Sequence, residues 1–254
     1  MLLPGTFSKV PEVTVLFWIL KILTTGMGEV ASDFLVRVLS PPTAICLGAI
    51  GFIFALYMQL KADRYRPWIY WLSIVMVSVL GTMVADSMHV GLGIPYAFST
   101  IGFIIILAAL FAAWYSAERT LSIHSIYTLK RELFYWGIVL ATFALGTAAG
   151  DMTAATFHLG YLVSGIVFAL LITLPLLARS VFKANGIATF WIAYILTRPL
   201  GASFADWMGV STIRGGLNIG TGQVTLILML CIIGLVWYVT ATHEDVITRK
   251  AMLK

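Results

Sequence analysis

The sequence predicts an all-α integral membrane protein with eight transmembrane helices. The 254 residues are 60% hydrophobic and only 11% charged, and the mean hydropathy of +0.97 is far above that of soluble domains. A repeated spacing of tryptophan, glycine and aspartate groups the helices in pairs. Apolar stretches of about 20 residues, enough to cross about 30 Å of hydrocarbon, lie at 12–36, 42–60, 67–88, 96–116, 133–155, 159–179, 186–208 and 218–241.

The first of these stretches is expected to remain in the membrane. The N-terminus, MLLPGTFSKVPEVT, lacks the basic start and small-residue cleavage site of a signal peptide. Cys46 and Cys231 fall within predicted spans without metal-type spacing, so they are expected to pack as small apolar side chains.

Basic residues are distributed unequally between the two sides of the membrane. Only Arg37 and Arg214 fall in the loops of one side, so the positive-inside rule places both termini in the cytoplasm. The net charge of +5 therefore indicates membrane orientation and no nucleic-acid partner. The predicted cytoplasmic basic residues are Lys9, Lys61, Arg64, Arg66, Arg119, Lys130, Arg131, Arg179, Lys183, Arg249, Lys250 and Lys254.

Four tandem repeats account for the order of the helices. In each repeat a glycine follows the tryptophan by ten residues and an aspartate follows it by fifteen. Because each repeat contains two spans, all copies point the same way and are related by a pseudo-symmetry axis along the membrane normal. The four sets are Trp18, Gly28 and Asp33; Trp71, Gly81 and Asp86; Trp136, Gly146 and Asp151; and Trp191, Gly201 and Asp206.

The predicted repeats extend over residues 9–66, 67–131, 132–185 and 186–243 of one membrane domain, and 244–254 form a cytoplasmic tail. This spacing, with the stretches KVPEVTVLFWILKILTT and GTMVADSMHVGLGIPY, resembles a bacterial family of uncharacterised membrane proteins built from four tandem two-helix repeats, each with a tryptophan. The resemblance covers nearly the whole chain. It implies this architecture and a bacterial inner-membrane location, but no particular substrate.

The repeated aspartates are the strongest candidates for a functional site. Tryptophan is typical of membrane interfaces, and each aspartate lies about 22 Å further along its helix, so we expect the aspartates in the outer part of the membrane. Parallel copies would gather them around one axis, where a ring of carboxylates attracts cations. The alternative is that each aspartate caps the following connection or hydrogen-bonds a neighbouring helix.

The first repeat contains one additional carboxylate. Glu29 precedes Asp33 by four residues and shares its helix face, whereas the equivalent positions hold Thr82, Thr147 and Ala202. Hard divalent cations prefer carboxylate and hydroxyl oxygens. Glu29 and the four aspartates are therefore the predicted metal ligands, and the two threonines form a second layer. Proton binding is an equally good use of Glu29.

The fourth repeat contains a base within its first helix. Arg198 follows Trp191 by seven residues, and Pro199, which lacks a backbone N–H, is expected to kink the helix. Arg198 is expected to face the bundle interior, either in a structural ion pair with Glu29 or an aspartate, or as a counter-ion that cation binding or protonation displaces. Lys21 is expected to snorkel to the cytoplasmic face.

Two histidines are candidates for further second-layer ligands. His89 follows Asp86 by three residues and His158 follows Asp151 by seven, and imidazole would extend the metal choice toward manganese, iron or zinc. The alternative is that both histidines lie in outer loops without a ligand role.

These features favour a membrane transporter of a cation, such as the divalent metal manganese, with proton coupling as an option. A cation channel with an aspartate selectivity ring and a non-transporting structural or partner-binding protein are the alternatives. No Ser/His pair, CxxC motif or phosphate-binding loop is present, so no enzyme, catalytic residue or required cofactor is predicted beyond a bound divalent cation. The expected partners are lipid and a small cation or proton, and the oligomeric state is left open.

Overall fold

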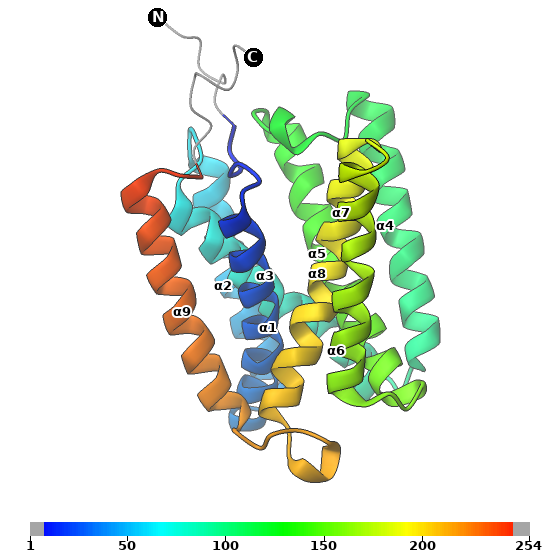
Figure 1. Cartoon of the computed structure of the whole chain (residues 1–254). Coiled ribbons are helices and arrows are strands. Elements are labelled where there is room, and N and C mark those ends of the chain that lie inside the picture. The colour runs from blue at the N-terminus through cyan, green and yellow to red at the C-terminus, as the bar shows by residue number, and fades with distance from the viewer. Residues whose placement is uncertain (1–7, 246–254) are drawn as a thin grey trace, which may run out of the picture.

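All regular structure in the described residues, 8–245, is helical in the computed structural model (Figure 1). Seven helical segments are long and apolar enough to cross a membrane, which confirms a multi-pass helical membrane protein. The helix at the eighth predicted span, 186–208, is present but is not among these seven. The helices are α1 (Val15–Val38), α2 (Pro41–Lys61), α3 (Pro67–Asp86), α4 (Tyr96–Glu118), α5 (Leu129–Asp151), α6 (Gly160–Leu171), α7 (Thr173–Ser180), α8 (Gly186–Gly209) and α9 (Thr221–Thr242).

Local sequence determines where the first helix of each repeat begins. The side chains of Thr14, Thr128 and Asn185 accept hydrogen bonds from backbone N–H groups in the first turns of α1, α5 and α8, as N-cap residues do. The remaining first helix, α3, begins at Pro67, which has no N–H to leave unpaired.

The predicted span 159–179 consists of two helices in the structure. They meet at Ile172, and Pro175 lies in the first turn of α7. Because proline has no backbone N–H, it cannot donate to the preceding turn of the helix. α6 and α7 still form one segment long enough to cross a membrane.

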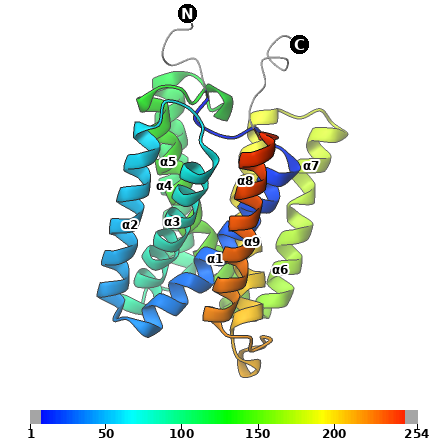
Figure 2. The same ribbon diagram turned by 90° about the vertical axis from the view of Figure 1, so that its left-hand side faces the viewer.

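The first helices of the repeats form an inner ring. Helix α1 contacts α3, α3 contacts α5, α5 contacts α8, and α8 contacts α1. Each second helix lies against the first helix of the next repeat: α2 on α3, α4 on α5, α6 and α7 on α8, and α9 on α1 (Figures 1 and 2). The membrane-spanning windows of α1, α3 and α5 are 67–72% buried, against 22–28% for the outer helices.

The repeat glycines lie where neighbouring inner helices touch. A β-carbon on any of the four would overlap a side chain on the next helix of the ring. In each case that side chain belongs to the residue seven positions after the repeat tryptophan of the next helix. The same close contact thus occurs four times, and the last one closes the ring from α8 to α1. The pairs are Gly28 with Ser78, Gly81 with Phe143, Gly146 with Arg198, and Gly201 with Thr25.

Three of the four repeat tryptophans lie inside the bundle, so their predicted place in an interfacial belt is wrong. Trp71, Trp136 and Trp191 are only 2–4% exposed, while Trp18 is partly buried. They pack among other aromatic side chains of the inner helices, and the Trp191 indole donates a hydrogen bond to the carbonyl of Leu121 at 2.9 Å. Their amphipathic rings therefore fill the core instead of contacting lipid headgroups.

The two cysteines also differ from expectation. Cys46 on α2 and Cys231 on α9 are exposed on the outer helices and are not packed in the interior. Outer helices turn much of their surface toward lipid, where a thiol behaves as a small apolar group.

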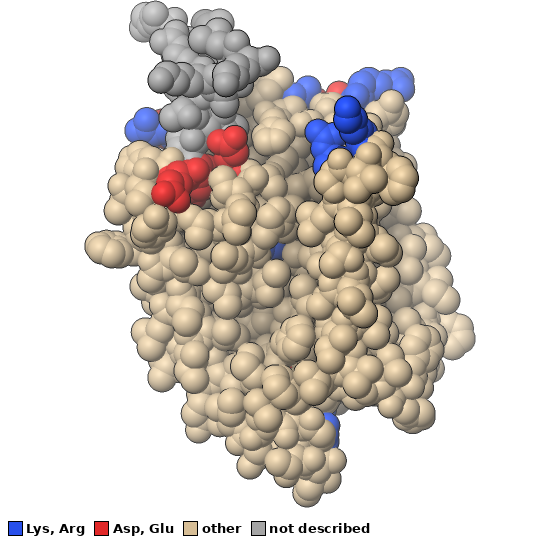
Figure 3. Space-filling view, in the orientation of Figure 1, with Lys and Arg blue, Asp and Glu red and all other residues tan. Residues whose placement is uncertain are grey.

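Both described chain ends lie at one end of the bundle (Figure 1). Charged side chains gather at this end, and below it the surface in view is almost free of them, with one small basic spot in a recess (Figure 3). Arg37 in the last turn of α1 and Arg214 after α8 lie at the opposite end. This distribution agrees with the predicted division of basic residues, of which Arg249, Lys250 and Lys254 lie outside the described residues.

The segment before α1, residues 8–14, covers the end of the bundle where the termini lie. The Lys9 ammonium donates to the buried carboxylate of Glu132 at 2.7 Å and to the carbonyl of Leu60 at 3.1 Å. The amide of Gln59 donates to the other Glu132 oxygen at 3.0 Å. These bonds join the first and third repeats at this end.

The glycine contacts can be tested by adding one methyl group. In Gly81→Ala the new β-carbon would lie 2.6 Å from the Phe143 β-carbon, so we expect overpacking to lower the free energy of unfolding in detergent by about 1–3 kcal/mol. Gly102→Ala is the matched control, because nothing lies within 4 Å of its β-carbon position, and it should be neutral or stabilising. Equal stability of the two variants would contradict the ring of close contacts.

Candidate cation site

A cavity of about 590 Å³ lies at the end of the bundle away from the termini. All four repeat aspartates and Glu29 line it. Asp86 and Asp151 are the last residues of α3 and α5, and each is followed by a short π-helical segment, Ser87–Gly91 and Met152–Thr156. Such π-turns redirect the chain at the cavity mouth and are frequent at functional sites.

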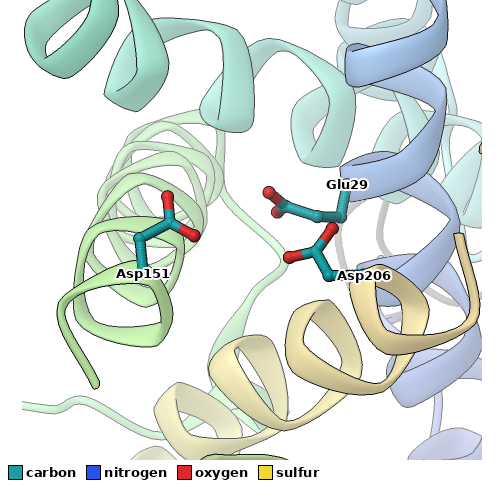
Figure 4. A group of neighbouring side chains, drawn as sticks. All are labelled: Glu29, Asp151 and Asp206. Carbon is teal, nitrogen blue, oxygen red and sulfur yellow. The ribbon is translucent and has the colours of Figure 1, made fainter. Parts of the chain in front are cut away.

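Three carboxylates come together deep in this cavity. Glu29, Asp151 and Asp206 each offer an oxygen, and these oxygens lie within 4.8 Å of one another. Figure 4 shows the three side chains pointing toward one another from α1, α5 and α8. Glu29 and Asp206 are only 4% and 6% exposed, so this negative charge is largely withdrawn from solvent.

The aspartates are not held by hydrogen bonds to neighbouring helices. Among the described residues no donor contacts the carboxylates of Asp86, Asp151 or Asp206. Asp33 has one ionic partner, Arg37, four residues later on the same helix and 3.5 Å away. The expectation that the aspartates might cap connections or bind adjacent helices thus has no support in these contacts.

Arg198 does not line the cavity but is bonded to Glu29, which does. Its guanidinium is fully buried and donates to Glu29 at 2.6 Å, to the Thr147 hydroxyl at 2.6 Å and to the Thr25 carbonyl at 3.0 Å. It also donates to the Thr82 hydroxyl. Of the two partners considered for Arg198, the structure contains the ion pair with Glu29.

Two predicted second-layer residues join this network. The hydroxyls of Thr82 and Thr147 each contact a Glu29 oxygen, at 3.2 and 3.3 Å. Because both threonines also accept from Arg198, they position the ion pair from two sides. Pro199 is accommodated within the continuous helix α8.

The histidines lie apart from the carboxylates. His89 contacts the carbonyl of Ile94 and the hydroxyl of Ser99, and its ring packs at a tilt against that of Tyr96, with centroids 4.0 Å apart. His158 is exposed in the connection before α6. Neither histidine lines the cavity, so the structure does not bring them to the predicted ligand set.

Three cavity residues were missed by sequence reasoning. Tyr96 and Tyr161 line the wall, and Arg214 lies at the mouth and donates to the Tyr161 hydroxyl at 2.5 Å. They belong to outer helices and a loop, where the repeat spacing gives no signal.

Lys21 also differs from its predicted position. It is fully buried, and its ammonium lies over the rings of Phe143 and Tyr194, 3.9 and 4.1 Å from their centroids. Lys21 does not snorkel. Its position was in fact indicated by spacing, because Lys21, Thr25, Glu29 and Asp33 recur every four residues and so lie along one face of α1.

The fold and the site define a multi-pass helical membrane protein of four tandem repeats with a buried acidic cavity. The chain belongs to the family described as Repeat of Unknown Function (DUF347), whose pattern matches residues 16–65, 69–120, 134–185 and 189–245. The expected relationship to a family of four tandem repeats is therefore confirmed. No curated protein and no solved structure matches this chain.

The buried ion pair can be tested by a double-mutant cycle. Arg198→Met should lower the free energy of unfolding by about 3–5 kcal/mol, because Glu29 is left buried without its partner. Combining Arg198→Met with Glu29→Gln should restore most of that loss, since no unpaired charge remains at the pair.

The control is Arg37→Met, which removes the half-exposed pair with Asp33 and should change stability by less than about 1 kcal/mol. Unfolding would be followed in detergent for all variants. Additive effects of the two site substitutions would contradict a coupled pair.

Proposed function

We propose that this protein is a membrane transporter of a cation, a divalent metal such as manganese. The observation that carries the proposal is the gathering of Glu29 and the four aspartates around one cavity. Inside a membrane, unpaired carboxylates are costly, and they persist mainly along ion pathways. A bound cation would supply the charge that the protein itself does not provide.

The donor set is suited to a hard divalent ion. Carboxylate oxygens are the preferred ligands of such ions, and the oxygens of Glu29, Asp151 and Asp206 are close enough to share one. Asp33 and Asp86 line the same cavity and would attract the ion as it enters. Arg214 at the mouth would limit the total negative charge presented to solvent.

Several features favour a carrier over a channel. A channel needs a continuous polar path, but Arg198 and the aromatic side chains below it fill the axis between the cavity and the termini. A carrier exposes its site to one side at a time, and here the cavity opens away from the termini. With a pseudo-fourfold axis along the membrane normal and both termini in the cytoplasm, the cavity would face the outside of a bacterial inner membrane.

A non-transporting membrane protein is the remaining alternative. It would be expected to satisfy each aspartate separately with hydrogen bonds, because an unsatisfied buried acid weakens a purely structural protein. The absence of donors around Asp86, Asp151 and Asp206 among the described residues favours the transporter.

Arg198 is the natural coupling element of such a carrier. A cation bound by Glu29, Asp151 and Asp206 would compete with the guanidinium for Glu29, because both seek the same carboxylate oxygens. Protonation of Glu29 would likewise release Arg198. Cation binding and proton binding would then act on one ion pair, and the state of that pair would differ between the loaded and empty carrier.

The proposal predicts which carboxylates limit transport. In proteoliposomes loaded with a manganese-sensitive dye, Asp151→Asn and Asp206→Asn should each reduce manganese flux at least about tenfold, equivalent to roughly 1.4 kcal/mol. Asp33→Asn should have a smaller effect, because Asp33 already has Arg37 as a partner.

Asp63→Asn is the matched control, because Asp63 is exposed in the loop between α2 and α3 and should leave flux unchanged. Saturating, slow flux would support a carrier, whereas ohmic single-channel currents would support a channel. The proposal fails if every aspartate of the cavity can become asparagine without changing manganese or proton flux.

A further inference from the structure

Lys21 is the buried charged residue that the cation site leaves unexplained. It lies in the second turn of α1, toward the termini, and its amine has no hydrogen-bond partner among the described residues. An ammonium group buried without an acceptor is unfavourable, whereas its contact with two aromatic faces is favourable. These opposing effects leave the charge of Lys21 sensitive to small changes in its surroundings.

The groups around Lys21 come from the neighbouring inner helices. Helix α8 contributes the ring of Tyr194 and the charge of Arg198, and α5 contributes the ring of Phe143. Neither α3 nor α9, which also pack against α1, adds a charged group that acts on Lys21 in the described part of the chain. Lys21 is therefore separated from the cavity carboxylates and is not a member of the cation site.

A series of buried tyrosine hydroxyls continues from Lys21 toward the termini. Tyr194, Tyr135 and Tyr70 are at most 1% exposed, and the hydroxyls of Tyr70 and Tyr135 are hydrogen-bonded at 2.5 Å. Among the described residues the buried Tyr194 hydroxyl has no hydrogen-bond partner, and its titratable neighbour is Tyr135.

The series ends near solvent at Tyr65. The ring of Tyr65 packs edge-on against Tyr70, with centroids 5.7 Å apart, and its hydroxyl donates to the carboxylate of Asp245. Tyr65 also lines a second cavity, of about 360 Å³, between the start of α3 and the end of α9. Burial raises the pKa of Asp245 above its usual range, so this carboxylate takes up a proton more readily than an exposed one.

We propose that Lys21 is a proton-binding site that exchanges with the termini end of the bundle through Tyr194, Tyr135, Tyr70 and Tyr65. Of these links only Tyr70–Tyr135 is hydrogen-bonded in the structure, so the Lys21 amine and the hydroxyls of Tyr194 and Tyr65 have to turn toward their neighbours before a proton passes. In each step an oxygen then accepts one proton and releases its own to the next, and the hydroxyls are unchanged after they rotate back. The net result is one proton moved between water and the Lys21 amine. The site rests on its own geometry, and only its use in coupling rests on the proposed function.

When Lys21 is protonated, such a site would place a positive charge beneath Arg198. When Lys21 is neutral, that charge would be absent. Repulsion between Lys21 and Arg198 would then favour release of the guanidinium from the axis when Lys21 is charged. Protons from the termini side would thereby influence the cavity that opens on the opposite side.

Nuclear magnetic resonance of protein labelled at the lysine ε-carbons, in lipid nanodiscs without metal, tests the site directly. The Lys21 signal is assigned by its loss in Lys21→Met, or by elimination with substitutions of the other lysines if that variant does not fold. We expect the signal to shift between its charged and neutral positions within about pH 5 to 9. A Lys21 signal fixed in one position over this range overturns the proposal.

The route is tested by Tyr135→Phe, which keeps the ring and removes the hydroxyl. Proton exchange at Lys21 should slow, so that one averaged ε-carbon signal becomes broad or splits in two near its midpoint. Tyr127→Phe, a partly exposed tyrosine at the same end, should leave the signal averaged. An unchanged line shape in Tyr135→Phe overturns the route. Neither measurement uses manganese, so failure of the proposed cation transport would be seen separately.

Discussion

The close approach of four helices at the repeat glycines is the constraint on which the rest of the structure depends. At each contact the glycine leaves no room for a β-carbon beside the next inner helix. A larger residue would separate the helices, as small residues are what allow backbones to approach in membranes. Because neighbouring inner helices lie this close together all around the ring, one face of each inner helix is directed to a common axis.

That axis is organised in layers. Residues three, seven, eleven and fifteen positions after each repeat tryptophan recur at helical spacing and share one face. A bundle with four identical residues in every layer would place like charges together, which is unfavourable away from solvent. Only the aspartate layer, at the open cavity, is uniform. In one deeper layer the positions equivalent to Glu29 hold two threonines and an alanine, and in the next the positions equivalent to Arg198 hold Thr25, Ser78 and Phe143. Each of these layers thus contains one charged residue, and the acid can pair with the base.

Sequence reasoning recovered seven of the eight spans, the four repeats and a set of acids that line one cavity, because these depend on hydropathy and on spacing within a single helix. It could not give the order of helices around the axis, since the glycine contacts form between repeats and no single repeat contains both partners. The interfacial preference of tryptophan and lysine was outweighed by the aromatic interior, which accommodates both an indole and an ammonium group. His89 was separated from the acids because a π-helical turn follows Asp86 and changes the face on which later residues lie.

The two halves of the axis differ in a way that a uniform repeat could not produce. Toward the open end the inner faces carry five acids, three of which have no donor among the described residues. Toward the termini they carry aromatic rings and tyrosine hydroxyls with very little exposure. The Arg198–Glu29 pair lies at the boundary, with threonines from α3 and α5 attached to it. In the proposed carrier, an ion that crosses would have to replace the guanidinium at Glu29 before it meets the aromatic half. The boundary would therefore have to rearrange for passage, and the two residues that form it, Glu29 and Arg198, are the two that break the repeat.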